Sequence, residues 1–212
     1  EPLDLWEIRD SMPREQWPHT RTYTVRWVDE AAAELAIDFV VHGDEGLAGP
    51  WAASARPGDA LVFTGPGGGF NPDPAADWYL FAGDESALPA ISASIESLPE
   101  DARGLAFLEV DGDADIQAIA APAGVELHWL LRGGVPAGAS DLLVTAVRDA
   151  TWPDGRVQVF AHGERGYMKS LREVLFRQHG LERSQVSLSG YWAKGRVEDD
   201  FQAEKKLPIG QI

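Results

Sequence analysis

The sequence predicts two structural parts: an antiparallel β region in residues 1–72, and an α/β domain with a five-stranded parallel sheet in residues 73–212. Two observations lead to this prediction. Apolar and polar residues alternate with a period of two near the N-terminus, which is typical of strands with one solvated face. After a connector rich in Gly, Pro, Asn and Asp at residues 66–74, strand-like runs alternate with helical patterns, as in a parallel sheet with crossover helices.

Three short strands are expected in the first part. Residues 21–28 alternate, with Tyr23 and Trp27 on one face, and residues 35–42 alternate in the same way. Residues 59–64 form a third candidate strand. Three strands are too few to close a barrel. The alternation suits an antiparallel sheet or barrel, and either an upstream part is absent from this chain or another element covers the edge.

The second part contains five strand-like runs and three helical patterns. The strands are expected at residues 78–82, 105–110, 126–130, 157–161 and 185–189. The helices are expected where apolar residues share one face, from Leu88 to Leu98, from Leu142 to Val147 and from Tyr167 to Phe176. Open parallel sheets bind ligands at the carboxyl ends of their strands, so the residues that follow the strands are the first candidates for a site.

Composition excludes several classes of function. The 18 Lys and Arg against 34 Asp and Glu give a net charge of −16, which repels a polyphosphate backbone and argues against nucleic-acid binding. The chain has no cysteine, so it offers no disulfide, no thiolate nucleophile and no thiolate-held cluster, and a cytoplasmic location is the simpler expectation. No apolar run approaches the ~18 residues of a membrane span. The five histidines show no metal-binding spacing, so no metal site is predicted.

Two motifs of the first part suggest a flat, phosphorylated ligand. In Arg21-x-Tyr23-Thr24, the arginine fork suits a pyrophosphate, the tyrosine ring suits stacking and the threonine offers polar groups to a ring. An amphipathic strand with a surface arginine is the alternative. In residues 46–52, small residues allow the backbone to approach a ligand, and Pro50 suits a first helical turn. The alternative there is a turn followed by a buried tryptophan.

Three segments of the second part directly follow predicted strands: Gly83–Ala90, Gly163–Glu164 and Gly190–Trp192. The first opens a helix, a geometry that receives nucleotide phosphates in open sheets, although Asp84, Glu85 or Ser86 would equally serve as an N-cap. Glu164 suits a ribose or an amide, or alternatively caps the helix that begins near Arg165. The aromatic pair at residues 191–192 either flanks a ring cofactor or belongs to the core.

The order and spacing of six segments closely resemble the siderophore-interacting protein family. The segments are RTYTVR at 21–26, DFVVHG at 38–43, GLAGPWA at 46–52, GDESALPA at 83–90, GE at 163–164 and SGYWAKG at 189–195. The resemblance covers residues 21–195. Members of this family are flavin-dependent ferric-siderophore reductases related to ferredoxin–NADP reductases.

The resemblance implies a partial FAD-binding β-barrel in residues 1–72, without the first strands that the family has before the Arg-x-Tyr-Thr strand. It implies an NAD(P)H-binding α/β domain with a C-terminal extension in residues 73–212. It places Arg21, Tyr23, Thr24, Asp38, Val40, His42, Ala48, Gly49 and Trp51 at the FAD. It places Gly83, Asp84, Ser86, Ala87 and Glu164 at the NAD(P)H, and Tyr191 and Trp192 near the flavin. The sequence departs from the family at Ser86, where threonine is commoner, and at His162, where alanine is common.

The resemblance implies that the chain reduces ferric siderophores with NAD(P)H and releases Fe(II), with the flavin and not a side chain carrying the chemistry. Ferric siderophores are often anionic, so a chain at −16 needs local positive charge, for which Lys194 and Arg196 are the candidates. Glu109 and Asp111 end the second parallel strand and favour NADH, whereas Arg132 favours NADPH; we lean to NADH. A general NAD(P)H:flavin or quinone reductase on the same fold, and a non-catalytic relative without the cofactor, are the alternatives.

Overall fold

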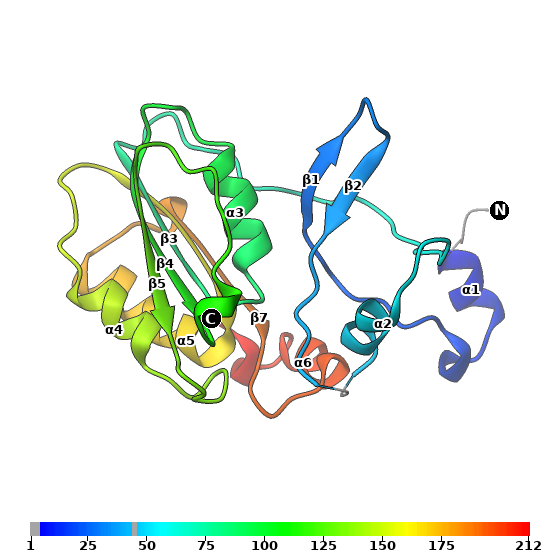
Figure 1. The fold of residues 1–212 in the computed structure, drawn as a ribbon. Coiled ribbons are helices and arrows are strands. Elements are labelled where there is room, and N and C mark those ends of the chain that lie inside the picture. Colours follow the sequence, from blue (N-terminus) through cyan, green and yellow to red (C-terminus); the bar gives the residue numbers. More distant parts are fainter. Residues whose placement is uncertain (1–4, 44–45) are drawn as a thin grey trace.

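The computed structural model describes residues 5–43 and 46–212, which form two parts lying side by side (Figure 1). Residues 5–77 make up a loosely built N-terminal part, and the remaining residues form an α/β sandwich. The strands are β1 (Val25–Asp29), β2 (Glu34–Ile37), β3 (Trp78–Gly83), β4 (Arg103–Val110), β5 (Gly124–Leu131), β6 (Val157–Glu164) and β7 (Val186–Trp192).

The α-helices are α1 (Leu5–Ser11), α2 (Ala48–Ser54), α3 (Leu88–Glu96), α4 (Leu142–Asp149), α5 (Arg165–Arg172) and α6 (Glu198–Glu204). Helix α5 continues as a π-helical segment, Glu173–Gln178. Short 3₁₀ turns lie at Arg14–Gln16, Asp113–Asp115, Arg183–Gln185 and Pro208–Gly210. In the described part of the chain, no helix is long and apolar enough to cross a membrane.

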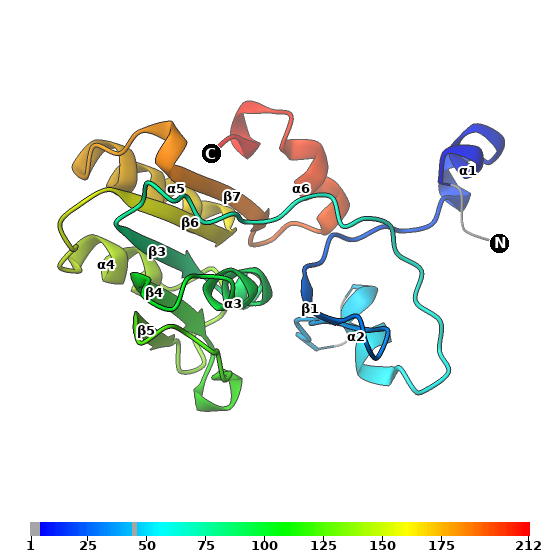
Figure 2. The same ribbon diagram turned by 90° about the horizontal axis from the view of Figure 1, so that it is seen from above.

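The predicted five-stranded parallel sheet is confirmed. Its strand order is β5-β4-β3-β6-β7, and every neighbouring pair is parallel. The central strand β3 and its neighbour β4 are almost entirely buried, which explains their continuous apolar runs. Figure 2 shows α3 between the sheet and the N-terminal part, and α4 and α5 on the opposite face. The carboxyl ends of all five strands therefore open on one edge of the sandwich.

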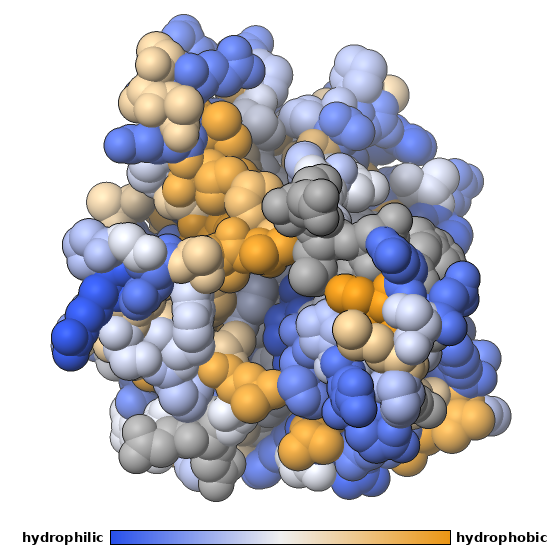
Figure 3. Space-filling model, turned by 90° about the vertical axis from the view of Figure 1, so that its right-hand side faces the viewer, coloured by the Kyte–Doolittle hydropathy of each residue, from blue (hydrophilic) through white to orange (hydrophobic). Residues whose placement is uncertain are grey.

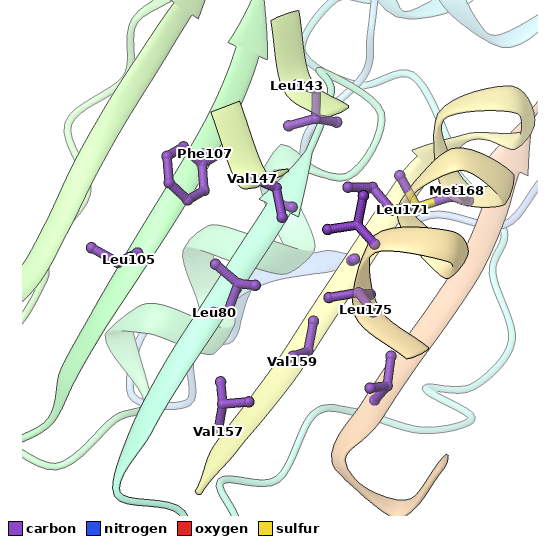
Figure 4. Close-up of a cluster of buried hydrophobic side chains, with 14 of the residues drawn as sticks. Leu80, Leu105, Phe107, Leu143, Val147, Val157, Val159, Met168, Leu171 and Leu175 are labelled. Atoms are coloured by element: carbon purple, nitrogen blue, oxygen red, sulfur yellow. The ribbon is translucent and has the colours of Figure 1, made fainter. Parts of the chain in front are cut away.

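Two apolar clusters hold the helices to the sheet. In the first, side chains from α4 and α5 point toward β3, β4 and β6, as Figure 4 shows. Each fully buried leucine or valine there contributes roughly 1.5–3 kcal/mol. The second cluster lies under α3, where Gly83 is essential for close packing. A Cβ atom on Gly83 would lie 2.6 Å from the carbonyl oxygen of His162 and 2.7 Å from Ile91 Cδ1.

The N-terminal part is less regular than predicted. Strands β1 and β2 form an antiparallel pair from Val25↔Ile37 to Asp29↔Glu34, shorter than the predicted runs. The predicted third strand at residues 59–64 is wrong, because that segment is irregular and finds no partner strand among the described residues. The described residues thus contain a two-stranded sheet and no closed barrel. Apolar side chains of this two-stranded sheet, such as Val28 and Leu35, remain exposed. Figure 3, viewed from the side of the N-terminal part, shows hydrophobic residues on the surface of the molecule.

A bidentate ion pair connects the two parts. The Nη1 and Nη2 groups of Arg26 on β1 donate to the two carboxylate oxygens of Glu96 on α3 at 2.5 and 2.7 Å. The hydrogen bond from Arg26 holds the pKa of Glu96 below its usual value. Since the Arg26 side chain is only 12% exposed, this pair is better shielded from solvent than an ordinary surface pair.

Candidate functional site

An aromatic cluster forms where the β1–β2 hairpin opens. Tyr23 and Phe39 lie just outside the ladder on adjacent segments, with ring centroids 4.4 Å apart, and Trp51 on α2 lies 5.8 Å from Phe39. Tyr23 is 40% exposed, so part of its ring is open to a ligand. Partial burial raises the pKa of its hydroxyl. Phe39 was not among the predicted residues, although the alternation of residues 35–42 puts it on the apolar face.

Arg21 lies beside this cluster. Its Nη1 group donates to the carbonyl of Thr20 at 2.9 Å and lies 3.5 Å from Asp199 Oδ1 on α6. Asp199 is largely exposed, so this is a weak surface pair. The guanidinium therefore remains a suitable partner for a ligand that carries two phosphate charges.

The other residues predicted for FAD are spread along the same side of the hairpin. Asp38, Val40 and His42 follow β2, which ends at Ile37, so they lie outside the ladder. Ala48 and Gly49 begin α2, and a Cβ on Gly49 would lie 3.4 Å from the carbonyl oxygen of Val40, so α2 packs directly on this segment. Thr24 immediately precedes β1 and is half-buried. The structure thus brings Tyr23, Val40, Gly49 and Trp51 into one region.

A second group of predicted residues meets at the carboxyl ends of β3, β6 and β7. Asp84 is its centre and is only 2% exposed. Its Oδ1 accepts from the amide and hydroxyl of Ser86 at 3.0 and 2.5 Å, and its Oδ2 accepts from the amide of Glu164 at 2.7 Å and the indole N–H of Trp192 at 2.9 Å. Burial raises the pKa of this carboxyl, and these hydrogen bonds oppose the rise. Asp84 is therefore a buried acceptor that fixes Ser86, Glu164 and Trp192 relative to one another at the carboxyl edge of the sheet.

The predicted N-cap for the first crossover helix is wrong. Helix α3 begins at Leu88 with Ala87 at the N-cap position, and no side chain caps it within the described residues. The carboxylate of Asp84 is instead directed toward Ser86, Glu164 and Trp192. Gly83 and Ala87 are buried, whereas Glu85 and Ser86 are half-buried. Since Glu85 is paired with Arg132, Ser86 is the half-buried polar residue of this segment that has no ionic partner.

Glu164 is the N-cap of α5, as one of the two interpretations predicted. Its Oε2 accepts from the amides of Gly166 and Tyr167, and its Oε1 accepts from the amide of Lys194 at 3.1 Å. The loop after β5 packs against it, because a Cβ on Gly138 would lie 3.1 Å from both Glu164 Cγ and the Trp192 ring. Both oxygens of Glu164 are thus engaged by backbone amides.

The aromatic pair at the end of β7 is placed by an irregularity in the ladder. Gly163 pairs with Gly190 and Glu164 pairs with Trp192, so Tyr191 is an extra residue opposite no partner on β6. Such bulges redirect side chains and are frequent near binding sites. The hydroxyl of Tyr191 lies 2.9 Å from His162 Nδ1, while the indole of Trp192 donates to Asp84. Neither aromatic side chain is fully buried.

The acidic residues expected at a ribose differ sharply in exposure. Glu109 is fully buried, and its carboxylate accepts from the hydroxyls of Ser140 at 2.6 Å and Tyr167 at 3.0 Å. The prediction that Glu109 contacts a ribose is therefore wrong. Asp111, directly after β4, is the exposed acid at the end of that strand. Arg132 is buried and donates to Glu85 at 2.5 Å.

Lys194 and Arg196 lie in the segment between β7 and α6. Lys194 is exposed, and only its backbone amide is tied to Glu164. The Nε of Arg196 donates to Glu204 on α6 at 2.6 Å, and Arg165 donates to the other oxygen of the same carboxylate. Of the two, Lys194 presents the freer positive charge.

Comparison with known proteins assigns both parts of the chain to one family. Residues 76–195 match the family described as siderophore-interacting protein, and residues 2–70 match the siderophore-interacting FAD-binding domain. The chain belongs to the siderophore-interacting protein family. The resemblance inferred from the six sequence segments is therefore confirmed.

Several relatives align with most of this chain, and the chain in turn covers about three quarters of their length. An uncharacterised protein of Mycobacterium tuberculosis is 48% identical over 214 residues, which cover 97% of this chain and 75% of that protein. Ferric vibriobactin reductase ViuB of Vibrio cholerae is 38% identical over 202 residues, 93% of this chain and 73% of that protein. The crystal structure of a siderophore utilization protein from T. fusca matches with a TM-score of 0.80 and 44% identity, covering 87% of this chain and 70% of that one.

The residues of the N-terminal part fit the FAD that the family implies. FAD requires a cationic partner for its diphosphate and a flat partner for its ring system. Arg21 supplies the first, and the partly exposed ring of Tyr23, backed by Phe39, supplies the second. The chemistry of these side chains matches both ends of the cofactor.

Proposed function

We propose that this chain binds FAD and reduces ferric siderophores with NADH or NADPH, so that Fe(II) is released in the cytoplasm. The observation that carries the proposal is that a guanidinium, Arg21, and a partly exposed aromatic ring, Tyr23, lie two residues apart on one segment. That segment matches an FAD-binding domain family. The name of ViuB, a ferric vibriobactin reductase, supports the substrate class. We also propose residues 1–72 as the FAD-binding unit and residues 73–212 as the NAD(P)H-binding unit.

When bound, FAD supplies the redox chemistry, for which a chain without cysteine has few side chains of its own. Each NADH gives up a hydride, so two ferric ions are reduced and one proton is released for every NADH oxidised. Siderophores bind Fe(III) through hard oxygen donors and bind Fe(II) much less strongly, so reduction releases the metal.

The chain's own residues would bind the FAD, the NAD(P)H and the ferric chelate and orient them relative to one another. Arg21 would hold the diphosphate, and Tyr23 would stack on the ring with Phe39 behind it. Ser86, kept in place by Asp84, would border the NAD(P)H, and Tyr191 and Trp192 would flank the flavin from the end of β7. Lys194 would attract an anionic ferric chelate, against the negative field of the whole chain.

We propose NADH as the preferred donor. Asp111 is an exposed acid at the end of β4, where a carboxylate accepts from a ribose hydroxyl and repels a 2′-phosphate. Arg132, the cation that would favour NADPH, is already paired with Glu85 and lies close to Glu109. A ratio of kcat/KM that strongly favours NADPH would contradict this preference.

The visible spectrum of the purified chain tests the central claim. After incubation with FAD and removal of excess cofactor, we expect flavin absorbance to stay with the protein, to bleach with NADH and to return with a ferric siderophore. A protein that retains no flavin under these conditions would refute the proposal.

Variants test the individual residues. Tyr23→Ala and Arg21→Ala should weaken FAD retention, whereas Trp27→Ala, an equally exposed aromatic residue on the same hairpin, is the matched control. Lys194→Ala should raise KM for an anionic ferric siderophore more than KM for NADH, with Lys206→Ala as the control. An equal effect of the two lysine substitutions would argue against a role of Lys194 at the substrate.

A further inference from the structure

His162 is a buried histidine that the proposed function does not use. It lies two residues before the end of β6, is 8% exposed and lies between two hydroxyl groups of β7. Its Nδ1 is 2.9 Å from the hydroxyl of Tyr191, and its Nε2 is 2.9 Å from Oγ of Ser187. The imidazole also stacks on the ring of Phe160 at 3.8 Å between centroids. Both ring nitrogens and one ring face are therefore fixed by neighbours.

The ladder explains why these groups meet. His162 pairs with Ser189 on β7, so Ser187 is its diagonal neighbour on the same face of the sheet, and Tyr191 follows Ser189 by two residues. Tyr191 is the extra residue of the bulge, so the ladder itself does not fix its direction. The hydrogen bond to His162 supplies the constraint that the ladder lacks.

A neutral imidazole suits this position. It carries one N–H donor and one acceptor nitrogen, and hydroxyl groups can fill either role, so both contacts are satisfied at once. Burial lowers the pKa of His162 to about 4, which keeps the ring neutral at physiological pH. An arrangement in which every polar atom is satisfied makes a rigid support for a neighbouring side chain.

We propose that His162 is a positioning residue that holds the ring of Tyr191 in place through Nδ1, and so sets the aromatic surface that the end of β7 presents to the flavin and its electron acceptor. The part of this proposal that concerns turnover rests on the proposed function. The part that concerns the position of Tyr191 does not.

Two substitutions separate positioning from simple space-filling. In an asparagine, the amide atoms are as many bonds from Cα as Nδ1 of histidine, whereas in a glutamine they are as many bonds from Cα as Nε2. His162→Asn should therefore keep the contact with Tyr191, and His162→Gln should keep the contact with Ser187. If His162 only filled space, the larger glutamine would be the better replacement.

The first experiment needs no cofactor. Imidazole nitrogen shifts are measured by NMR on the ¹⁵N-labelled chain, with the signals of His162 identified by their loss in His162→Asn. We expect one neutral tautomer, a change at Nδ1 in Tyr191→Phe and a change at Nε2 in Ser187→Ala. An unchanged Nδ1 signal in Tyr191→Phe would overturn the proposal. If His162→Asn fails to fold, the His162 signals are identified in the wild type by through-bond correlation from its assigned backbone, so the test does not depend on a folded His162 variant.

The second experiment measures turnover of a ferric siderophore. We expect His162→Gln to lower kcat by about tenfold or more, because small misplacements in a reactive site are costly, with little change in KM for NADH. His162→Asn should stay closer to the wild type, and Tyr191→Phe should add nothing to His162→Gln in the double variant. The matched controls are His128→Asn and His128→Gln, at a half-buried histidine on β5, away from β7.

The outcomes distinguish the two proposals. A wild-type chain without FAD binding or turnover refutes the proposed function, and the nitrogen shifts alone then decide whether His162 holds Tyr191. An active wild type in which His162→Gln equals or exceeds His162→Asn, or in which the double variant shows additive losses, overturns the positioning role.

Discussion

Acidification should destabilise the fold through His162, by an amount that follows from its burial. The pKa of this histidine is lowered to about 4 in the folded chain, against about 6.5 in an unfolded chain, because burial disfavours the charged ring. Between these two pH values the unfolded chain binds a proton at this position and the folded chain does not. Stability is therefore complete above pH 6.5 and falls as the pH drops toward 4.

The magnitude follows from the width of this interval. Each pH unit is worth about 1.4 kcal/mol for one proton, so His162 accounts for about 3 kcal/mol of unfolding free energy over the whole interval. Between pH 7 and pH 5, the two convenient conditions, the expected loss is about 2 kcal/mol. The side chain is almost fully buried, so solvent screening reduces this value little.

The assay is urea unfolding, followed by circular dichroism at pH 7 and pH 5, of the wild type and His162→Asn. Groups such as His179 and Glu96, whose pKa values are also lowered, act equally in both proteins and cancel in the difference. We expect the variant to lose about 2 kcal/mol less than the wild type on acidification. Equal losses would refute the reasoning. His19→Asn, at an exposed histidine before β1, should behave as the wild type.

Three further substitutions test the contacts that hold the molecule together. Glu96→Ala removes both close hydrogen bonds of Arg26 and leaves it only the 4.0 Å contact with Asp38, so it should lower the unfolding free energy by about 1–3 kcal/mol. Arg177→Ala, in the exposed pair with Glu173, should change it by about 0.5 kcal/mol or less, and equal effects of the two in urea unfolding would contradict this. Asp84→Asn places an amide N–H₂ among the four hydrogen-bond donors that surround the Asp84 carboxylate, so it should lower the unfolding free energy by about 1–3 kcal/mol in the same assay. An unchanged urea midpoint would argue against these four hydrogen bonds. Phe201→Ala removes the buried anchor of α6 and should cost about 3–5 kcal/mol, with faster hydrogen exchange in residues 198–204, while the exposed Val197→Ala should not alter that exchange.

The elements of the α/β part were predictable because their signals are local. The apolar runs of β3 and β4 reflect burial on both faces, and the spacing of Tyr167, Leu171 and Leu175 reflects one buried side of a helix. The N-terminal part was less predictable, because a strand exists only where a partner lies beside it. Residues 59–64 have the apolar composition of a strand and no partner in the described part of the chain.

In the candidate site too, local features could be predicted from the sequence and contacts between separate segments could not. The chemistry of Arg21 and Tyr23 was readable from the sequence, since a guanidinium and an aromatic ring two residues apart suit a phosphorylated ring ligand. The contact between Tyr23 and Phe39 was not, because it joins two segments whose relative position depends on the hairpin register.

The sequence by itself determined the alternation of strands and helices, the absence of thiol chemistry and the family of the protein, because each depends on residue types and their spacing. Only the tertiary structure decided which charged and polar groups face inward. Glu109 and Asp84 are acids at predicted strand ends, and the structure encloses both among hydrogen-bond donors. His162 stood out in the sequence only as a departure from the family, and the structure places it against the hydroxyl of Tyr191. The reason is physical: burial and hydrogen bonding depend on groups brought together across the sheet, and Asp84 and Trp192 are 108 residues apart in the chain.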